Sequence, residues 1–400
     1  MKILFVSDNC SYEMYAKIDQ ERLIKLLPAQ QNFYRLLLDG LLSTSECDIE
    51  CLSAIPVSAS CHTKRIWEYS EENITPHLKY VYIPFVNTKY RRHITQFLST
   101  YRLCNKWLKE NKKTEEKIIL VDSIIMQCAL AAKMAAKKYR CNIVGVVTDI
   151  AKYTTQILGK PQSYVKRIIR KFYDKFSDFA VKGLDGYIFL TEYMHEEINF
   201  ANKPYIVVEG ISTDVSISDN RSVEERNYVM YAGGVHEKFG VLKLAKAYAQ
   251  LSVKWPLHIY GSGPDVDKII SMQNDNIKYM GVLSQEDIIR KERGAKLLIN
   301  PRPSEEEFTK FSFPSKTMEY MASGTAVLST PLKGIPDEYK PYIFWFEDET
   351  ESGMASKIQE ILSMQDADLL NKGNQAREFV LENKNYIKQG ERVLQFLKRI

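Results

Sequence analysis

Short apolar runs alternate with longer amphipathic stretches along most of this chain. Runs such as Lys2–Ser7 are typical of buried strands, whereas Ala29–Leu42 and Ile94–Glu110 repeat apolar residues at helical spacing. Strands that alternate with helices predict an α/β protein with parallel sheets and helices on both faces. The strands expected in the first half are Lys2–Ser7, Asp48–Ser53, Tyr80–Ile83, Lys117–Val121, Asn142–Thr148, Gly186–Leu190 and Tyr205–Val208.

The polar stretch Glu209–Asn227 interrupts this pattern, and its Ser, Asp, Glu and Asn content predicts a linker. The alternation then restarts. We therefore expect two Rossmann-like domains in tandem, residues 1–210 and 228–385, joined at 211–227 and binding a ligand at the carboxyl ends of their strands. Residues 386–400 are predicted to form a last helix that packs back on the first domain. The strands expected in the second half are Val229–Ala232, Leu257–Tyr260, Ile277–Tyr279, Lys296–Asn300, Ala326–Ser329 and Ile343–Phe346.

Composition adds limits to this architecture. A hydrophobic share of 45% in 400 residues suits two domains with cores of their own. No apolar run has the length of a membrane span, and the N-terminus lacks the pattern of a secretory signal. The seven cysteines are scattered without a CxxC pair, and the histidines form no HxH or HExxH pattern. We expect a cytoplasmic protein without a disulfide framework, metal site or cofactor.

Two segments are locally basic, residues 88–113 and residues 160–183. The second also repeats apolar residues at helical spacing. One interpretation is a pair of basic amphipathic helices that lie on an anionic membrane surface, which would make the protein peripheral on the inner face of the membrane. The other is two solvated helices that pack on their own domain. Nucleic acid is not expected as a partner, because no helix-turn-helix, RNP or zinc-finger pattern accompanies the charge.

The segment Phe313–Gly324 carries the strongest indication of chemistry. Pro314 suits the entry to a helix, and Ser315–Thr317 would form a first turn whose unpaired N–H groups attract phosphate. Lys316 adds a cation, and Glu319 is placed to accept hydrogen bonds from sugar hydroxyls. The segment therefore predicts a pocket for a diphosphate flanked by a polyol, as in a nucleotide sugar. An ordinary amphipathic helix with a surface lysine and glutamate explains the spacing equally well.

Two glycine-containing loops also follow predicted strands of the second half. Gly233 and Gly234 would let backbone N–H groups approach phosphate, and Lys238 would neutralise charge. Gly261 and Gly263 follow the next strand. Each loop alone is a weak indication, and a plain surface turn explains it. Together with the Phe313–Gly324 segment they gather at the strand ends where open α/β sheets bind ligands.

The set YAGG-x3-K, YGSGP and FPSK-x2-EYMASGT resembles the donor-binding domain of family 4 glycosyltransferases, and more narrowly those that build bacterial surface polysaccharides. The resemblance spans roughly Tyr228–Glu338. It implies a GT-B fold, a nucleotide-sugar donor, a glycan or lipid-linked acceptor, no required metal, and transfer with retention of anomeric configuration. It also implies that Lys238 pairs with the diphosphate, that Glu319 binds the ribose, and that the amides of Ser315 and Lys316 contact the diphosphate.

The chain departs from the family pattern at two positions. Gly233 stands where an arginine is usual, and Phe311 stands where the first glutamate of the E-x7-E motif is expected. That glutamate normally helps to bind the transferred sugar. Arg302, in the preceding loop, is one candidate to supply the missing cation. The acidic loop Glu305–Glu307 is a candidate for the carboxylate, and an exposed acidic loop without such a role is the alternative.

The acceptor is expected at the first domain. Asp149 follows an apolar strand, where it would orient the acceptor hydroxyl as a catalytic residue or cap the next turn. Asp8 and Asn9 end the first strand, and Gln30 and Gln31 precede a helix. Two other functions remain open at this point. A nucleotide-sugar epimerase would use the same fold, and a non-catalytic subunit that binds a partner transferase or a glycan would explain the two departures.

Overall fold

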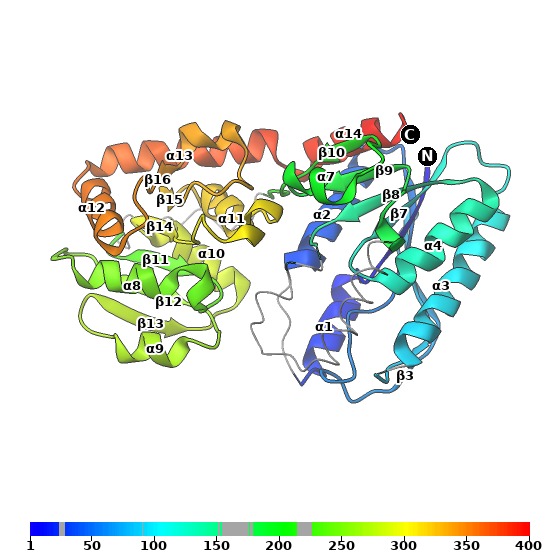
Figure 1. Ribbon diagram of the computed structural model, residues 1–400, viewed down its shortest axis with the longest axis horizontal. Coiled ribbons are helices and arrows are strands. Elements are labelled where there is room, and N and C mark those ends of the chain that lie inside the picture. The colour runs from blue at the N-terminus through cyan, green and yellow to red at the C-terminus, as the bar shows by residue number, and fades with distance from the viewer. Residues whose placement is uncertain (24–28, 90, 151–152, 154–175, 177–178, 214–225) are drawn as a thin grey trace. The chain divides into compact units, whose positions relative to one another are not determined.

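The computed structural model describes residues 1–23, 29–89, 91–150, 153, 176, 179–213 and 226–400 (Figure 1). The chain forms two compact units. The first comprises Met1–Glu209 with Tyr386–Ile400, and the second comprises Gly210–Asn385. Most of the second basic segment, near residues 160–183, lies outside the described residues, and so does most of the expected linker at 211–227.

The first unit is built on an eight-stranded sheet with the order β10-β9-β8-β7-β1-β2-β5-β4. β1 occupies the interior, pairing with β2 on one side and β7 on the other. All neighbours are parallel except β4, which pairs antiparallel with β5. The strands are β1 (Lys2–Ser7), β2 (Asp48–Ser53), β4 (Ser70–Thr75), β5 (Leu78–Tyr82), β7 (Lys117–Asp122), β8 (Asn142–Val147), β9 (Gly186–Phe189) and β10 (Tyr205–Val207).

Strand β4 departs from the predicted parallel sheet. Its sequence, SEENIT, is polar and mostly exposed, so it carries no apolar run for a sequence pattern to detect. A short antiparallel pair, β3 (Ile66–Trp67) with β6 (Phe85–Val86), is a second such exception. The parallel core of the sheet agrees with the α/β prediction.

Helices accompany the strands of the first unit, and α3 packs against α4. The last helix of the chain, α14 (Tyr386–Leu397), packs against α2 (Ala29–Ser43). The two backbones meet closely at Gly40 and Gly390, because a Cβ on Gly390 would lie 2.1 Å from the carbonyl carbon of Gly40. The other helices in the described part of this unit are α1 (Tyr12–Gln20), α3 (Arg91–Glu110), α4 (Met126–Tyr139) and α7 (Tyr193–Ile198).

The second unit has a six-stranded, fully parallel sheet with the order β13-β12-β11-β14-β15-β16. This unit has two hydrophobic cores, and alternate residues of strand β11 enter each of them. Val229 and Tyr231 lie in one core, and Met230 and Ala232 lie in the other. The strands are β11 (Val229–Ala232), β12 (Leu257–Tyr260), β13 (Ile277–Gly281), β14 (Leu297–Asn300), β15 (Val327–Ser329) and β16 (Phe344–Trp345).

Each core of the second unit takes its helical side chains from its own set of helices. One includes Leu244 of α8 and Ile358 of α12, and the other includes Met318 of α11 and Val380 of α13. The parallel sheet is thus covered by helices on both faces, as predicted. The helices are α8 (Val241–Ala249), α9 (Val266–Ser271), α10 (Gln285–Gly294), α11 (Ser315–Ser323), α12 (Glu351–Leu362) and α13 (Asp366–Asn383).

Candidate functional site

The N-terminus of α11 lies after β14, at the carboxyl edge of the second sheet. Pro314 occupies the N-cap position. We expected the first three amides of the helix to be unpaired, and this is wrong for Thr317, whose N–H donates to the Pro314 carbonyl at 2.8 Å. The Thr317 hydroxyl accepts from Nδ2 of Asn300 at the end of β14, so Thr317 anchors the helix. In the described chain, the Ser315 and Lys316 amides have no such partner, and they remain available to a ligand.

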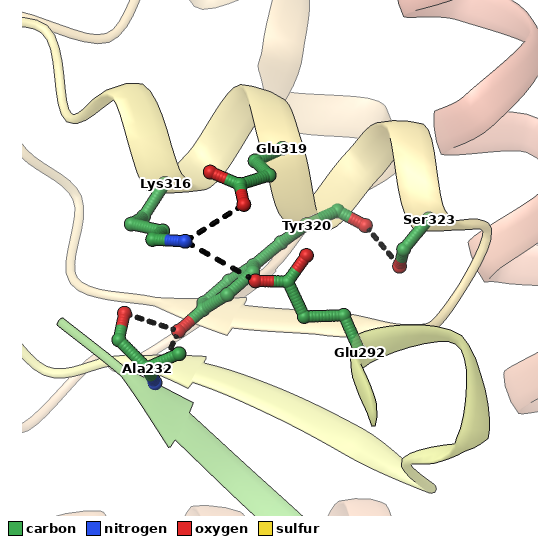
Figure 2. Close-up of polar contacts among 6 residues, drawn as sticks. All are labelled: Ala232, Glu292, Lys316, Glu319, Tyr320 and Ser323. Carbon is green, nitrogen blue, oxygen red and sulfur yellow. Dashed lines mark hydrogen bonds and ion pairs between the residues drawn. The ribbon is translucent and has the colours of Figure 1, made fainter. Parts of the chain in front are cut away.

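Lys316 and Glu319 form an ion pair one helical turn apart, with 2.7 Å between Nζ and Oε1 (Figure 2). Both side chains are partly exposed. Burial alone would lower the pKa of Lys316, but the charges of Glu292 and Glu319 outweigh it and raise this pKa. Lys316 therefore presents a fixed positive charge beside the helix start, where the macrodipole also favours an anion.

Glu292 is a site residue that the sequence did not reveal. It lies in the last turn of α10 and is fully buried, and its Oε1 is 3.4 Å from Nζ of Lys316. Figure 2 shows its carboxyl directed at the same ammonium that Glu319 contacts. Burial, followed by the charge of Glu319, raises the pKa of Glu292 to about 8. Glu292 sits among many charged residues of α10, so only the fold distinguishes it.

Tyr320 fixes α11 on the sheet. Its buried hydroxyl accepts from the N–H of Ala232 at 2.8 Å and donates to the Ala232 carbonyl at 3.1 Å. The helix that carries Lys316 and Glu319 is therefore held at the end of β11, from which the first glycine loop departs. Because the two contacts are to main chain, they position the helix independently of neighbouring side chains.

The glycines of the two loops permit close packing between the loops. A Cβ on Gly261 would lie 1.8 Å from the carbonyl oxygen of Gly233, and one on Gly263 would lie 2.1 Å from that of Val235. The Gly233 N–H donates to the carbonyl of Tyr260. Gly233, Gly261 and Gly263 thus allow the loops after β11 and β12 to pack against each other. This role is additional to the phosphate contact that the sequence suggested.

Lys238 lies in a single 3-10 turn, Glu237–Phe239, that follows the first loop. Its N–H donates to Nδ1 of His236 at 3.1 Å, and the Glu237 N–H donates to Asp265 at 2.7 Å. A Cβ on Gly234 would lie 2.9 Å from the Phe239 ring, so a larger residue there would displace this ring. The backbone of the Lys238 turn is therefore anchored at its N-terminal end by His236 and Asp265.

Arg302 is the candidate for the missing cation, and Phe311 is one of the two positions where this chain departs from the family pattern. The Arg302 guanidinium lies over the rings of Phe239 and Phe308, at 5.1 and 5.8 Å from their centroids. Burial lowers its pKa. Phe311 is buried in the 3-10 helix Glu307–Phe311 and packs as an apolar residue. Arg302 thus approaches the Lys238 turn through Phe239, whereas position 311 supplies no carboxylate.

Polar residues also gather at the carboxyl edge of the first sheet. Gln31 Nε2 donates to Oδ1 of Asp8 at 3.1 Å after β1, and Gln30 Nε2 donates to Oδ2 of Asp122 at 3.1 Å at the end of β7. Burial raises the pKa of both aspartates, with the charge of Asp8 adding to the effect at Asp122. The sequence pointed to Asp8, Gln30 and Gln31. It missed Asp122, although this residue directly follows an apolar strand.

Asp149 follows β8, the strand next to β7. Its Oδ1 accepts from the N–H of Ile150 at 2.8 Å. This contact to the adjacent residue does not distinguish turn capping from a role at the acceptor, so both stay predictions. Strand β8, which precedes Asp149, pairs with β7, which ends at Asp122. The two carboxyls therefore lie at the same edge of the sheet.

The described residues contain neither a metal-ligand cluster nor a membrane-spanning helix. Within them, no group of three or more His, Cys, Asp or Glu side chains is arranged to bind a metal ion. No helix in the described ranges combines the length and apolar character that crossing a bilayer requires.

Comparison with known proteins gives a family match within the second unit. Residues 226–364 match the family described as "Glycosyl transferases group 1". The match covers the β11, β12 and α11 loops, so the resemblance of those motifs to glycosyltransferases is confirmed over this region, whereas family 4 stays a prediction. No curated protein sequence matches the chain.

Solved structures are similar over the whole chain. A sucrose-phosphate synthase from Thermosynechococcus elongatus is 14% identical, with a TM-score of 0.68 over 100% of this chain and 99% of that one. The apo lipopolysaccharide outer core galactosyltransferase WaaB is 14% identical, with a TM-score of 0.62 over 100% and 99%. Anabaena HepE in complex with UDP is 13% identical, with a TM-score of 0.61 over 100% of both chains. The fold is GT-B. At these identities the similarity concerns the fold alone.

Proposed function

We propose that this protein is a glycosyltransferase that moves a sugar from a nucleotide-sugar donor to a glycan or lipid-linked acceptor. The observation that carries the proposal is the cluster at the start of α11. There the Ser315 and Lys316 amides, which have no partner among the described residues, lie beside the Lys316 and Glu319 side chains at the end of β14. Amides and a lysine suit a diphosphate, and a carboxylate suits sugar hydroxyls. The group 1 match over the same residues supports this assignment.

The chemistry proposed for this cluster is stabilisation of the leaving diphosphate. Negative charge develops on that group as the glycosidic bond breaks, and fixed donors aimed at it lower the barrier. Lys316 and the Ser315 and Lys316 amides supply such donors, with Lys238 and Arg302 as further cations. Because no enzymatic nucleophile is evident in the part of the chain that the structure describes, we propose transfer with retention through same-face attack assisted by the departing phosphate. The reaction requires no metal or cofactor in this scheme.

The acceptor is proposed to bind at the carboxyl edge of the first sheet, where Asp149 orients its hydroxyl. The carboxyls of Asp8, which is half-buried, and Asp122, which is buried, lie at the same edge and accept from Gln31 and Gln30. The proposed setting is bacterial surface polysaccharide synthesis, on the basis of the motif resemblance. The protein would then act in the cytoplasm, next to the membrane that carries a lipid-linked acceptor.

A thermal-shift screen of UDP, GDP, ADP and CMP sugars tests the donor assignment. One nucleotide class should raise the melting temperature of the wild type, because a ligand that binds only the folded state stabilises it. The shift should vanish in Lys316→Met and persist in Lys333→Met, a change at an exposed lysine of the same unit. Equal shifts in both variants would place the donor elsewhere.

The two rival functions give different products. An epimerase converts the nucleotide sugar without any acceptor, so incubation of the donor alone distinguishes it. A non-catalytic subunit binds the donor in calorimetry and releases no nucleotide with any lipid-linked acceptor pool. Release of nucleotide that depends on acceptor supports the transferase.

Helix α3 supports a further proposal, attachment to an anionic membrane surface. Its exposed residues include the apolar side chains of Ile94 and Leu98, 62% and 57% exposed. The cations Arg91 and Arg102 lie on the same exposed stripe, at helical spacing from them. An apolar stripe bordered by cations is the pattern of helices that lie in the membrane interface.

A further inference from the structure

Glu292 approaches Lys316 from the interior of the second unit. Its side chain is 0% exposed, whereas the side chains of Lys316 and Glu319 are 33% and 24% exposed. The two carboxyls therefore contact one ammonium from different environments (Figure 2). Glu319 meets it at the surface, where a ligand would arrive, and Glu292 meets it from the protein side.

Within the described ranges, the Lys316 ammonium alone offsets the negative charge of both carboxyls, Glu292 and Glu319. The charged and titratable groups that face Glu292 are Lys316 and Glu319 from α11, together with the phenol of Tyr320. In the described chain, Oε2 of Glu292 has no hydrogen-bond partner. An ionised carboxylate in this position is poorly compensated, since burial disfavours its charge and Lys316 is shared.

We propose that Glu292 is a positioning residue for the donor, holding Lys316 from the protein side and taking up a proton when a nucleoside diphosphate engages that ammonium. The inference rests on the proposed function. The phosphates add negative charge near Glu292. They also pair with the Lys316 ammonium, which otherwise offsets the negative charge of the Glu292 carboxylate. Both effects favour the neutral carboxyl, which gains its proton from solvent while no covalent bond to the ligand forms.

The pH range of this uptake follows from the pKa of Glu292. The free protein already carries the proton well below about pH 8, so little is taken up there. Above that pH the free protein is ionised and the complex is protonated, so binding consumes up to one proton. The affinity for the diphosphate then falls as pH rises, by at most roughly tenfold per pH unit. Lys316 and Tyr320 do not titrate in this range, because their pKa values are raised from already high ones.

Calorimetric titration in buffers of different ionisation enthalpy measures this proton directly. The probes are UDP, GDP and ADP, each titrated at about pH 9, where their own phosphates are fully ionised. The wild type should take up close to one proton per diphosphate bound. Glu292→Gln should take up none, while it binds within a few-fold of the wild type near pH 7, because glutamine resembles the protonated carboxyl.

Glu286→Gln is the matched control, because it makes the same change at an exposed position of α10. It should retain the uptake of the wild type. Binding without proton uptake in the wild type, or equal uptake in Glu292→Gln, overturns the inference and leaves the donor site standing. Failure of all three diphosphates to bind overturns the proposed function with it. If Glu292→Gln does not fold, the wild-type titration still decides.

Discussion

The hydroxyl of Tyr320 bonds both main-chain polar groups of Ala232, the last residue of β11. β14 pairs with Val229 and Met230 of this strand, and its ladder stops before Ala232. The phenol thus supplies the partners that a neighbouring strand would otherwise provide. This contact couples the stability of the sheet to the placement of the helix that carries Lys316.

Tyr320→Phe should destabilise the protein by roughly 2 kcal/mol or more, because it leaves a buried N–H and a buried carbonyl unsatisfied. Urea unfolding monitored in the second unit measures this. Tyr248→Phe is the control, since that hydroxyl makes one bond, to the Trp255 carbonyl, and its loss should cost about 1 kcal/mol. An equal cost for the two variants would show that the contacts to Ala232 contribute little.

Lys238→Ala and Glu319→Ala should each weaken binding of the donor nucleotide by roughly ten- to a hundredfold, the value of one or two charge-assisted hydrogen bonds. Calorimetry with the nucleotide found in the thermal-shift screen gives the dissociation constants. Lys333→Ala and Glu286→Ala, both at exposed positions of the same unit, serve as controls. Unchanged affinity in Lys238→Ala and Glu319→Ala would remove both residues from the site.

Gly261→Ala should prevent stable folding of the second unit or lower its melting temperature strongly. The added Cβ would lie 1.8 Å from the Gly233 carbonyl, at a φ of +131°. Gly281→Ala is the comparison, because Gly281 also has a positive φ but nothing within 4 Å of its Cβ position. That change should cost only the backbone strain, about 1 kcal/mol. Similar melting temperatures for the two variants would contradict close packing of the loops.

His258 should make the second unit less stable in acid. Burial, together with Lys278 and Lys291, lowers its pKa from 6.5 to about 4. The unfolded chain therefore binds more protons than the folded one between these values, so stability falls as pH decreases through this window and levels off below it.

Denaturant unfolding between pH 7 and pH 4 tests the effect of His258. His258→Phe, which keeps the stacking on Tyr228, should lose less stability over this range than the wild type. His93→Gln, at an exposed position of α3, should behave like the wild type. Parallel curves for His258→Phe and the wild type would rule out this contribution.

Vesicle flotation tests the membrane proposal for α3. The wild type should float with vesicles that contain anionic lipid and remain unbound to neutral ones. The double variant Ile94→Ser, Leu98→Ser should float less, because it loses the exposed apolar stripe. Ile270→Ser, a change at an exposed apolar residue of the second unit, should float like the wild type. Flotation that depends neither on anionic lipid nor on α3 would exclude the proposal.

The sequence predicted the parts of the fold that depend on local pattern. Apolar runs located β1, β2, β11 and β12 at their observed bounds, because buried parallel strands are continuous apolar segments. The same approach missed β4, since its exposed residues show no such pattern. Local pattern thus identifies strands that enter a core and not those at a polar sheet edge.

In the candidate site, too, contacts between residues close in sequence could be predicted, and contacts made by the fold could not. Lys316 and Glu319 are one helical turn apart, so their proximity follows from the sequence alone. Glu292 is 24 residues from Lys316 and reaches it only through the packing of α10 against α11. Asp122 is likewise brought near the Asp8 edge by strand order. The glycine motifs can be recognised in the sequence. Their spacing does not show that the two loops pack closely, because that contact depends on the fold.

Because the chain leaves the first unit after Glu209 and returns to it at Tyr386, the second unit is an uninterrupted insertion within the first. Removing the last fifteen residues would therefore uncover α2 and damage the lobe that contains the N-terminus. By contrast, the second unit, Gly210–Asn385, is one continuous segment of the chain and can be exchanged as a whole. Exchanging it between related genes would replace the unit that carries Lys316 and Glu319 and would leave the eight-stranded sheet of the first unit in place.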